Sequence, residues 1–372
     1  MRLDRIYRAS AGVLLALLMS SVSGCSSMGP LLAPDAPQSN DVAPAVASIT
    51  AAQAADEIVI GIIGWPEAEN LSGGSIDATT KAARLAIEGL TLRNTSFVIY
   101  DEQSAGSGAA LGKRFVDADV SVVVGGATAG TVSEMATVLD DKSVPTLTLA
   151  SISDTSLQLY SAALNPRSEA SALVREARFR GLTRIGIVSG TEAGSASLAG
   201  IIAQMALEQA IGVQIISGAD EGSFVRDMAE GTQAGALDAL VFITSPQSAV
   251  RLLQTGGIAS VNTQIVGNAS WALAEPLPAV LRSAWYPSLP MPALSTFRER
   301  YRSTFNETPT LSAAILYDLV IMAAALSQRE GGQDYSSATL KNASGFRGFT
   351  GPFAFGAVGL IEDRSYNIVS SD

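Results

Sequence analysis

The chain of 372 residues carries 24 Lys and Arg against 35 Asp and Glu, a formal net charge of −11, which argues against binding of its folded body to nucleic acid or to anionic membranes. The sequence contains no histidine, and this excludes Ser-His-Asp and Cys-His catalysis and removes the commonest zinc ligand. Because neither a G-x-x-x-x-G-K-[ST] phosphate loop nor a G-x-S-x-G elbow is present, we expect a protein that is not an enzyme and that holds no metal and no cofactor.

The N-terminus has the layout of an export signal. Residues 1–8 carry three arginines against one aspartate, and residues 9–22 are mostly small or apolar, the order expected of a secretory signal. The segment ends in Val-Ser-Gly followed by Cys25, the only cysteine of the chain. The V-S-G-C spelling resembles a bacterial lipobox, which predicts a signal peptide over 1–24 and a lipoprotein carrying diacylglycerol and palmitate on Cys25. An ordinary signal peptide with an incidental cysteine and a membrane anchor are the alternatives.

The next segment, 25–56, is predicted to be a tether. After the cysteine it reads SSMGPLLAPDAPQSNDVAPAVASITAAQAAD, which is dominated by alanine, proline and serine and has no helical or strand period. The protein would therefore meet a membrane only through its lipid anchor, at the periplasmic face of the cell envelope. The residue after the cysteine is Ser26 and not an aspartate. In the sorting pattern of Gram-negative lipoproteins, this residue favours the outer membrane.

The first part of the body alternates strand and helix patterns. Strands are predicted at 57–64, 96–101, 120–126 and 144–151, and helices at 76–90, through Leu111 and Phe115, and at 131–141. Four such units with short connections predict a parallel sheet that is covered by helices on both faces.

A second series of the same kind begins after residue 165. Helices are predicted at 169–182 and 195–212, and strands at 184–190, 213–218, 239–245 and 263–267. They indicate a second parallel α/β unit. After about residue 286 the pattern changes to an amphipathic helix at 293–309, a very apolar helix at 311–328 and terminal strands with turn glycines. Because Asp318 lies in the middle of the apolar helix, we expect that helix to be buried in protein rather than to cross a membrane.

Four segments of the body, in this order, resemble type I periplasmic binding proteins of the Leu/Ile/Val-binding branch. They are FVIYDEQSAGSGAALGKRFVDADVSVVVGG at 97–126, LDALVFITSPQSAVRLLQT at 237–255, FRERYRSTFNETPTLSAAILYDLVIMAAAL at 297–326 and GFRGFTGPFAF at 345–355. The resemblance covers about 57–372, and it depends on the common order of the segments.

The resemblance implies an α/β fold of two doubly wound parallel-sheet lobes joined by a three-strand hinge. The chain would cross between the lobes near 160–168, 284–292 and 347–356. Lobe one would then comprise 57–165 plus 286–350, and lobe two 166–285 plus 351–372. A small-molecule ligand would bind beyond the carboxyl ends of the strands, between the lobes, and hinge closure would trap it.

The loops that follow the strands supply the candidate ligand-binding residues. These are Trp65, Glu67, Ala127, Thr128, Ala129, Thr148, Ala150 and Ser151 in lobe one, and Thr191, Glu192, Ser245, Asn268 and Trp271 in lobe two. Hydroxyl and backbone N–H groups at such loops suit a carboxylate or a neutral polar group, and Trp65 offers an apolar wall or a cation–π face. The alternative is that they are ordinary loop and capping residues.

The amino-acid site of the resembling family is matched here only in part. Thr128 and Ser151 lie near the positions whose hydroxyls hold the ligand α-carboxylate. The family's Tyr-Gly pair is replaced by Glu192-Ala193-Gly194, and its acidic residue after the 263–267 strand is replaced by Asn268-Ala269-Ser270. Glu192 could supply the lost acid from a neighbouring loop.

Two functions fit these features. One is a substrate-binding lipoprotein that captures an amino acid or another small polar solute for the permease of an ABC importer. The other is an outer-membrane lipoprotein, similar to penicillin-binding-protein activators, that regulates a peptidoglycan synthase through protein–protein contact. The importer function predicts permease and ATPase genes beside this one, whereas the activator function does not.

Overall fold

The structure is a computed structural model, and the residues that it describes are 57–64, 78–101, 105–126, 128–152, 158–192, 194–232, 236–256, 263–274, 276–289, 294–329, 333–361 and 364–371. The predicted signal peptide, Cys25 and the tether lie outside the described residues. Their assignments therefore stay predictions.

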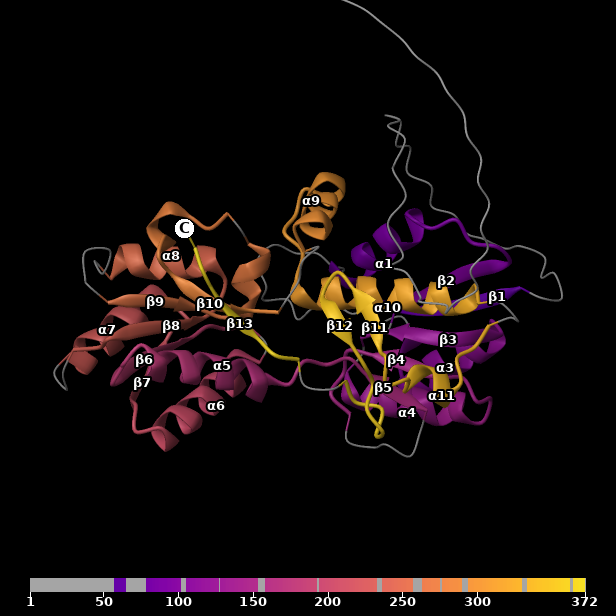
Figure 1. Ribbon diagram of the computed structural model, residues 1–372, viewed down its shortest axis with the longest axis horizontal. Coiled ribbons are helices and arrows are strands. Elements are labelled where there is room, and N and C mark those ends of the chain that lie inside the picture. The colour runs from indigo at the N-terminus through magenta and orange to yellow at the C-terminus, as the bar shows by residue number, and fades with distance from the viewer. Residues whose placement is uncertain are drawn as a thin grey trace, which may run out of the picture. The chain divides into compact units, whose positions relative to one another are not determined.

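The first sheet has five strands in the order β2-β1-β3-β4-β5, all parallel (Figure 1). They are β1 Ile58–Gly64, β2 Thr95–Asp101, β3 Val120–Gly125, β4 Thr146–Thr148 and β5 Leu159–Ser161. Successive side chains of β1 enter two different buried clusters. Ile60 and Ile62 pack in the cluster that holds Leu85, and Ile63 packs in the cluster that holds Phe115. Since neighbouring strand residues point to opposite faces, both faces of this sheet are covered.

Helices from two distant parts of the chain cover the first sheet. They are α1 Ala78–Glu88, α3 Gly108–Asp117, α4 Ala129–Asp140 and, from the C-terminal part, α10 Leu311–Ser327, with the short α11 Ser337–Leu340 beyond it. α1 packs against α10, and α3 packs against α4. The late segment thus returns to the first sheet, as the change of pattern after residue 286 predicts.

The second sheet has six strands in the order β13-β10-β9-β8-β6-β7. They are β6 Arg184–Ser189, β7 Gly212–Ser217, β8 Ala239–Ile243, β9 Gln264–Gly267, β10 Trp285–Ser288 and β13 Asn367–Ser370. All neighbours are parallel except β10 and β13, which pair antiparallel at the edge, where the yellow β13 lies beside β10 in Figure 1. Val241 and Ile243 of β8 pack in one cluster, and Leu240 and Phe242 in another, so this sheet is also covered on both faces.

The helical elements between these strands belong to the second sheet. They are α5 Pro166–Phe179, α6 Ser195–Glu208, α7 Glu221–Thr232, α8 Pro246–Thr255, and the 3-10 turns η2 Ala269–Leu273 and η3 Ala279–Leu281. Polar residues begin several of them. Asn165 accepts the N–H of Arg167 (3.0 Å) and is followed by proline at the first position of α5, and Ser245 accepts the N–H of Ser248 (3.2 Å) at the start of α8. These are the preferred residue types for a helix start.

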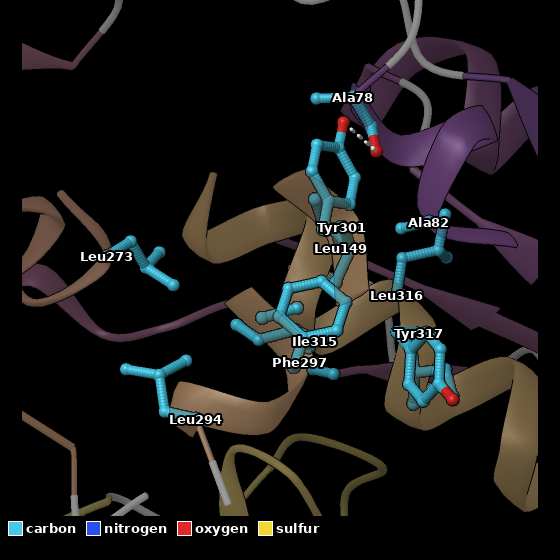
Figure 2. Packing of buried hydrophobic residues seen from close by; sticks show 14 of the residues in the cluster. Ala78, Ala82, Leu149, Leu273, Leu294, Phe297, Tyr301, Ile315, Leu316 and Tyr317 are labelled. Atoms are coloured by element: carbon cyan, nitrogen blue, oxygen red, sulfur yellow. Dashed lines mark hydrogen bonds between the residues drawn. The ribbon is translucent and has the colours of Figure 1, made fainter. Parts of the chain in front are cut away.

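Aromatic packing joins α9 Leu294–Phe305 to α1 and α10. The ring of Phe297 lies 5.2 Å from that of Tyr317, and the hydroxyl of Tyr301 donates to the carbonyl of Ala78 at 3.3 Å (Figure 2). The same cluster extends to Leu273 of η2. The hairpin β11 Phe346–Gly348 and β12 Gly351–Phe353 completes this part of the fold.

In the order of the described elements, the chain passes between the two sheets three times. The first passage follows β5, and the second follows β10. The third differs from the prediction of 347–356, because that segment forms the β11–β12 hairpin and Leu360 bridges Ser161 of β5. The chain reaches the second sheet only at β13, so 351–361 lies with the first sheet. The predicted fold class of two parallel α/β units is confirmed, and the division into hinged lobes is carried forward as a proposal.

The apolar helix α10 is buried, as its central aspartate predicts. The Asp318 carboxylate is only 3% exposed and accepts the backbone N–H groups of Phe349 (2.7 Å) and Thr350 (2.8 Å). Among the described residues, no helix combines the length and the hydropathy that a membrane crossing requires.

Candidate ligand-binding site

Two of the candidate residues after β3 lie at the start of a helix of the first sheet, Thr128 as its cap and Ala129 as its first residue. Thr128 precedes α4, and its side chain accepts the N–H of Thr131 at 3.5 Å. Thr128 and Ala129 are both exposed. The first turn of a helix presents N–H groups and a partial positive charge, so this exposed end suits an anionic group. Ala127 and the two candidates after β1, Trp65 and Glu67, lie outside the described residues.

The three candidates after β4 have different environments. Thr148 is fully buried, and its hydroxyl accepts the N–H of Ala150 at 3.0 Å. The carbonyl of Ala150 in turn accepts the hydroxyl of Ser161 at 2.7 Å. These bonds shape the strand end, whereas Ser151 is exposed. Because Gly125 pairs with Thr148, the ends of β3 and β4 bring Ser151 and the start of α4 to the same edge of the sheet.

The second sheet has a pocket of about 620 Å³ at the carboxyl ends of β6, β7 and β8. Its lining comprises Thr191, Glu192, Gly218, Ala219, Asp220, Glu221, Gly222, Thr244, Ser245, Ser248, Arg251 and Leu252. The structure therefore brings together three of the sequence candidates, Thr191, Glu192 and Ser245. Three carboxylates and one guanidinium line the pocket, an arrangement that favours a ligand with a cationic group.

Glu192 is held in this pocket by only one of its carboxylate oxygens. Its Oε1 accepts the hydroxyl of Thr244 and the N–H of Ser245, the latter at 3.2 Å. Its Oε2 is buried and has no hydrogen-bond partner among the described residues. A buried carboxylate oxygen without a donor is costly, so a donor supplied by a ligand would stabilise it.

Asp220 and Arg251 are site residues that the sequence reasoning missed. Asp220 follows β7 and accepts the N–H and the hydroxyl of Ser223, both at 2.8 Å, and these bonds lower the pKa of its carboxyl. Arg251, on α8, donates to Ser248 at 3.0 Å. The strand-end rule, applied also to the loop after β7, would have found Asp220. Arg251 lies one helical turn inside α8, where that rule does not reach.

The two candidates after β9 do not line this pocket. Asn268 caps η2 by accepting the N–H of Ser270 at 3.2 Å and its hydroxyl at 2.6 Å. Trp271 is fully buried, and its indole N–H donates to the carbonyl of Thr244 at 2.8 Å. Its ring packs in the core against Phe242, so in this structure Trp271 presents no ring surface to the pocket.

A larger hollow lies at the other end of the first sheet. It measures about 990 Å³ and is lined by Asp119, Val120, Lys142 and Pro145, among others, at the amino ends of β3 and β4. Ligands of open parallel sheets bind at the carboxyl ends of the strands. We therefore assign the candidate site to the carboxyl ends of the strands and not to this hollow. The described residues hold no group of three or more acidic, histidine or cysteine side chains that could bind a metal ion.

The chain belongs to the periplasmic binding protein family, whose model matches residues 72–366. This agrees with two α/β sheets of mainly parallel strands and with the polar pocket at the strand ends of the second sheet. The family consists of binding proteins rather than enzymes, and its members act in the periplasm or outside the cell. A search of curated proteins finds no match.

Solved structures with the same fold include three solute-binding proteins. One, the ABC transporter substrate-binding protein of Desulfitobacterium hafniense in complex with leucine, has 19% identity and a TM-score of 0.60 over 85% of this chain and 98% of that one. The branched-chain amino acid transporter substrate-binding protein of Streptococcus pneumoniae, in complex with isoleucine, has 17% identity and a TM-score of 0.59 over 84% and 99%. The ABC transporter solute-binding protein of Rhodopseudomonas palustris BisB5, in complex with 3,4-dihydroxybenzoic acid, has 14% identity and a TM-score of 0.61 over 85% and 98%.

These similarities support the fold prediction and do not favour the activator-like alternative. They are all well below 25% identity, so the ligands of those proteins do not by themselves define the ligand of this one.

Proposed function

We propose that this protein is the substrate-binding component of an ABC importer and that it captures a small polar solute with a carboxyl group, such as an amino acid. The main support is the family match over 72–366 together with the acidic pocket at the carboxyl ends of β6, β7 and β8. The two lobes would close over the solute by bending of the three passages between the sheets.

The exposed start of α4 would bind the carboxylate of the solute. Thr128 and the backbone N–H groups of the first turn are donors at the positive end of the helix dipole. Ser151 adds a hydroxyl at the same sheet edge. Leucine, isoleucine and 3,4-dihydroxybenzoic acid, which occupy the similar structures, share a carboxyl group.

The acidic pocket of the second lobe would bind the amino group of the solute. The family's usual acid after β9 is replaced by Asn268, and Glu192 provides a carboxylate two strands away instead. Its unpartnered Oε2 supports this role, because an ammonium can donate to it. Asp220 adds negative charge to the same pocket.

The N-terminal sequence supports a location in the cell envelope. A lipid on Cys25 would hold the body at the periplasmic face of the cell envelope, with 25–56 as a tether and the outer membrane favoured if the cell is Gram-negative. A diacylglycerol with a further acyl chain gives stable anchoring. Labelling with radioactive palmitate, compared between the natural chain and Cys25→Ser, tests this part separately.

A thermal-shift screen tests the ligand. The probes are the proteinogenic L-amino acids and 3,4-dihydroxybenzoate, added singly over a concentration series. A ligand that binds only the folded protein must raise the melting temperature as its concentration increases. Absence of a shift with every probe would contradict the proposal.

The variant Glu192→Gln then tests the site for an amino-acid ligand. Loss of the charge opposite a buried ammonium is expected to weaken binding by roughly tenfold to a hundredfold. Glu230→Gln is the matched control, because Glu230 is an exposed residue of α7 in the same lobe. Equal affinities of the two variants would remove Glu192 from the site.

A further inference from the structure

A small buried cluster lies where the three passages between the sheets meet. It consists of Ala172, Ala269, Leu289 and Tyr366, with Leu164, Leu311 and Ile368 packed against it. We call it the hinge cluster. Leu164 lies in the first passage, Leu289 follows β10 in the second, and Tyr366 precedes β13 in the third. Any bending of the passages must therefore change the packing of this cluster.

Glu169 on α5 holds a loop of the candidate site beside the hinge cluster. Its Oε1 accepts the backbone N–H of Ala269 at 2.8 Å. Ala269 begins η2 directly after Asn268. A single side chain thus connects α5 to the loop that follows β9, although the two are 100 residues apart in the sequence.

The carboxyl group of Glu169 lies in an environment that disfavours its charged form. Burial raises the pKa of Glu169 to about 7, and the N–H of Ala269 opposes this only in part. The charge of Glu169 contributes, after burial, to the raised pKa of Tyr366. The structure describes no ion pair that would compensate the charge of Glu169.

The cation whose charge acts on Tyr366 is directed elsewhere. Arg364, in the third passage, donates to the carbonyl (3.2 Å) and the hydroxyl (2.8 Å) of Thr350. The same Thr350 donates to Asp318 of α10. The groups that interact with Glu169 from the elements packed around it are thus the phenol of Tyr366, which also feels the charge of Arg364, and the uncharged backbone of η2.

We propose that Glu169 is a positioning residue whose protonation state sets how firmly the Asn268–Ser270 loop is held at the hinge cluster near neutral pH. The neutral acid remains packed against the cluster. The ionised form draws in water, and the loop then opens more often. The consequence for ligand affinity rests on the proposed function, whereas the effect on the loop does not.

Hydrogen–deuterium exchange of the full chain without ligand tests this proposal. Protection factors of peptides covering 263–274, corrected for the intrinsic pH dependence of exchange, are compared at pH 6 and pH 8. The natural protein is expected to lose protection there by up to about tenfold at pH 8. Linkage changes an equilibrium by at most about tenfold per pH unit for one proton, and with a pKa of about 7 for Glu169 only the unit from pH 6 to pH 7 contributes. Peptides of β8 are expected to keep their protection.

Two substitutions separate positioning from a merely structural role. Glu169→Gln keeps the size of the side chain and cannot ionise, so its protection is expected to be the same at both pH values. Glu230→Gln, the exposed control, is expected to keep the pH dependence of the natural protein. The proposal is overturned if the natural protein shows no pH dependence over 263–274 or if Glu169→Gln shows the same dependence as the natural protein. Any co-purified solute is first removed by unfolding, dialysis and refolding, so these results do not depend on whether the proposed function is correct.

Discussion

The carboxylate of Glu192 occupies the space that a side chain at Gly190 would need. A Cβ atom built on Gly190 would lie 1.9 Å from Glu192 Oε2 and 2.9 Å from the Cβ of Thr244. The end of β6 is therefore shaped around this carboxylate. Because Gly190 has no side chain, the Glu192 side chain can fold back toward the end of β8. There Thr244 and Ser245, which follow β8, donate to its other carboxylate oxygen.

Substitution of Gly190 by alanine is expected to displace the Glu192 carboxylate. The added methyl group must push it away from Ser245 and press against Thr244, which costs about 1–3 kcal/mol of stability. Ligand affinity is expected to fall in parallel. Urea unfolding and calorimetric titration measure the two effects.

Gly200→Ala is the matched control for this substitution. Gly200 lies within α6, where an added Cβ meets nothing within 4 Å, so alanine is expected to raise stability by about 0.5–1 kcal/mol. If Gly190→Ala were as stable as Gly200→Ala and bound ligand normally, the assigned conformation of Glu192 would be incorrect.

The fold could be predicted well from the sequence, because its long strands are uninterrupted apolar runs. Buried parallel strands require such apolar runs. Helical patterns separate the runs in the sequence, as they do for β1, β3, β6 and β8. β5 was missed, since three residues ending in serine carry no periodic signal. β10 contains a proline, and its sequence was assigned to a crossing rather than to a strand of the sheet.

The candidate site could be predicted only where it follows a strand directly. Thr191, Glu192 and Ser245 were found by that rule. Glu169 was not found, because its partner Ala269 is distant in the sequence. An acidic residue in the first turn of a helix is also explained by the helix dipole alone, so its presence does not point to a partner. The burial of Trp271 could not be predicted, since position in the chain does not indicate whether a ring points to solvent or to the core.

The buried carboxylate of Asp318 is expected to be important for stability. Asp318→Asn keeps its shape but replaces one acceptor oxygen by an amide N–H, which faces the N–H groups of Phe349 or Thr350. Leaving such a buried donor unsatisfied costs about 1–3 kcal/mol. Denaturant unfolding measures the loss.

Asp117→Asn provides the comparison for this prediction. Asp117 forms an exposed pair with Lys113 on α3, and such pairs contribute about 0–1 kcal/mol. A loss at Asp318 no larger than that at Asp117 would show that the hairpin does not depend on this carboxylate.

Glu169 is also expected to make global stability depend on pH. The raised pKa of about 7 lies above the reference value of 4.5, so the folded protein binds this proton more tightly than the unfolded chain. The resulting stabilisation is complete below pH 4.5, declines between pH 4.5 and 7, and is absent above pH 7. It amounts to about 3 kcal/mol.

The difference in unfolding free energy between the natural protein and Glu169→Gln isolates this effect from other titrating groups. We expect that difference to shift against the natural protein as the pH rises from 4.5 to 7, and to be constant above pH 7.5. A difference that does not vary between pH 4.5 and 7 would mean that Glu169 has an ordinary pKa.

Native mass spectrometry of the protein purified without added ligand tests solute capture most directly. The account predicts a complex whose excess mass corresponds to one small carboxylic acid, released when the protein unfolds and diminished in Glu192→Gln. A spectrum with only the mass of the free chain, unchanged after incubation with a mixture of the proteinogenic amino acids and 3,4-dihydroxybenzoate, would contradict it.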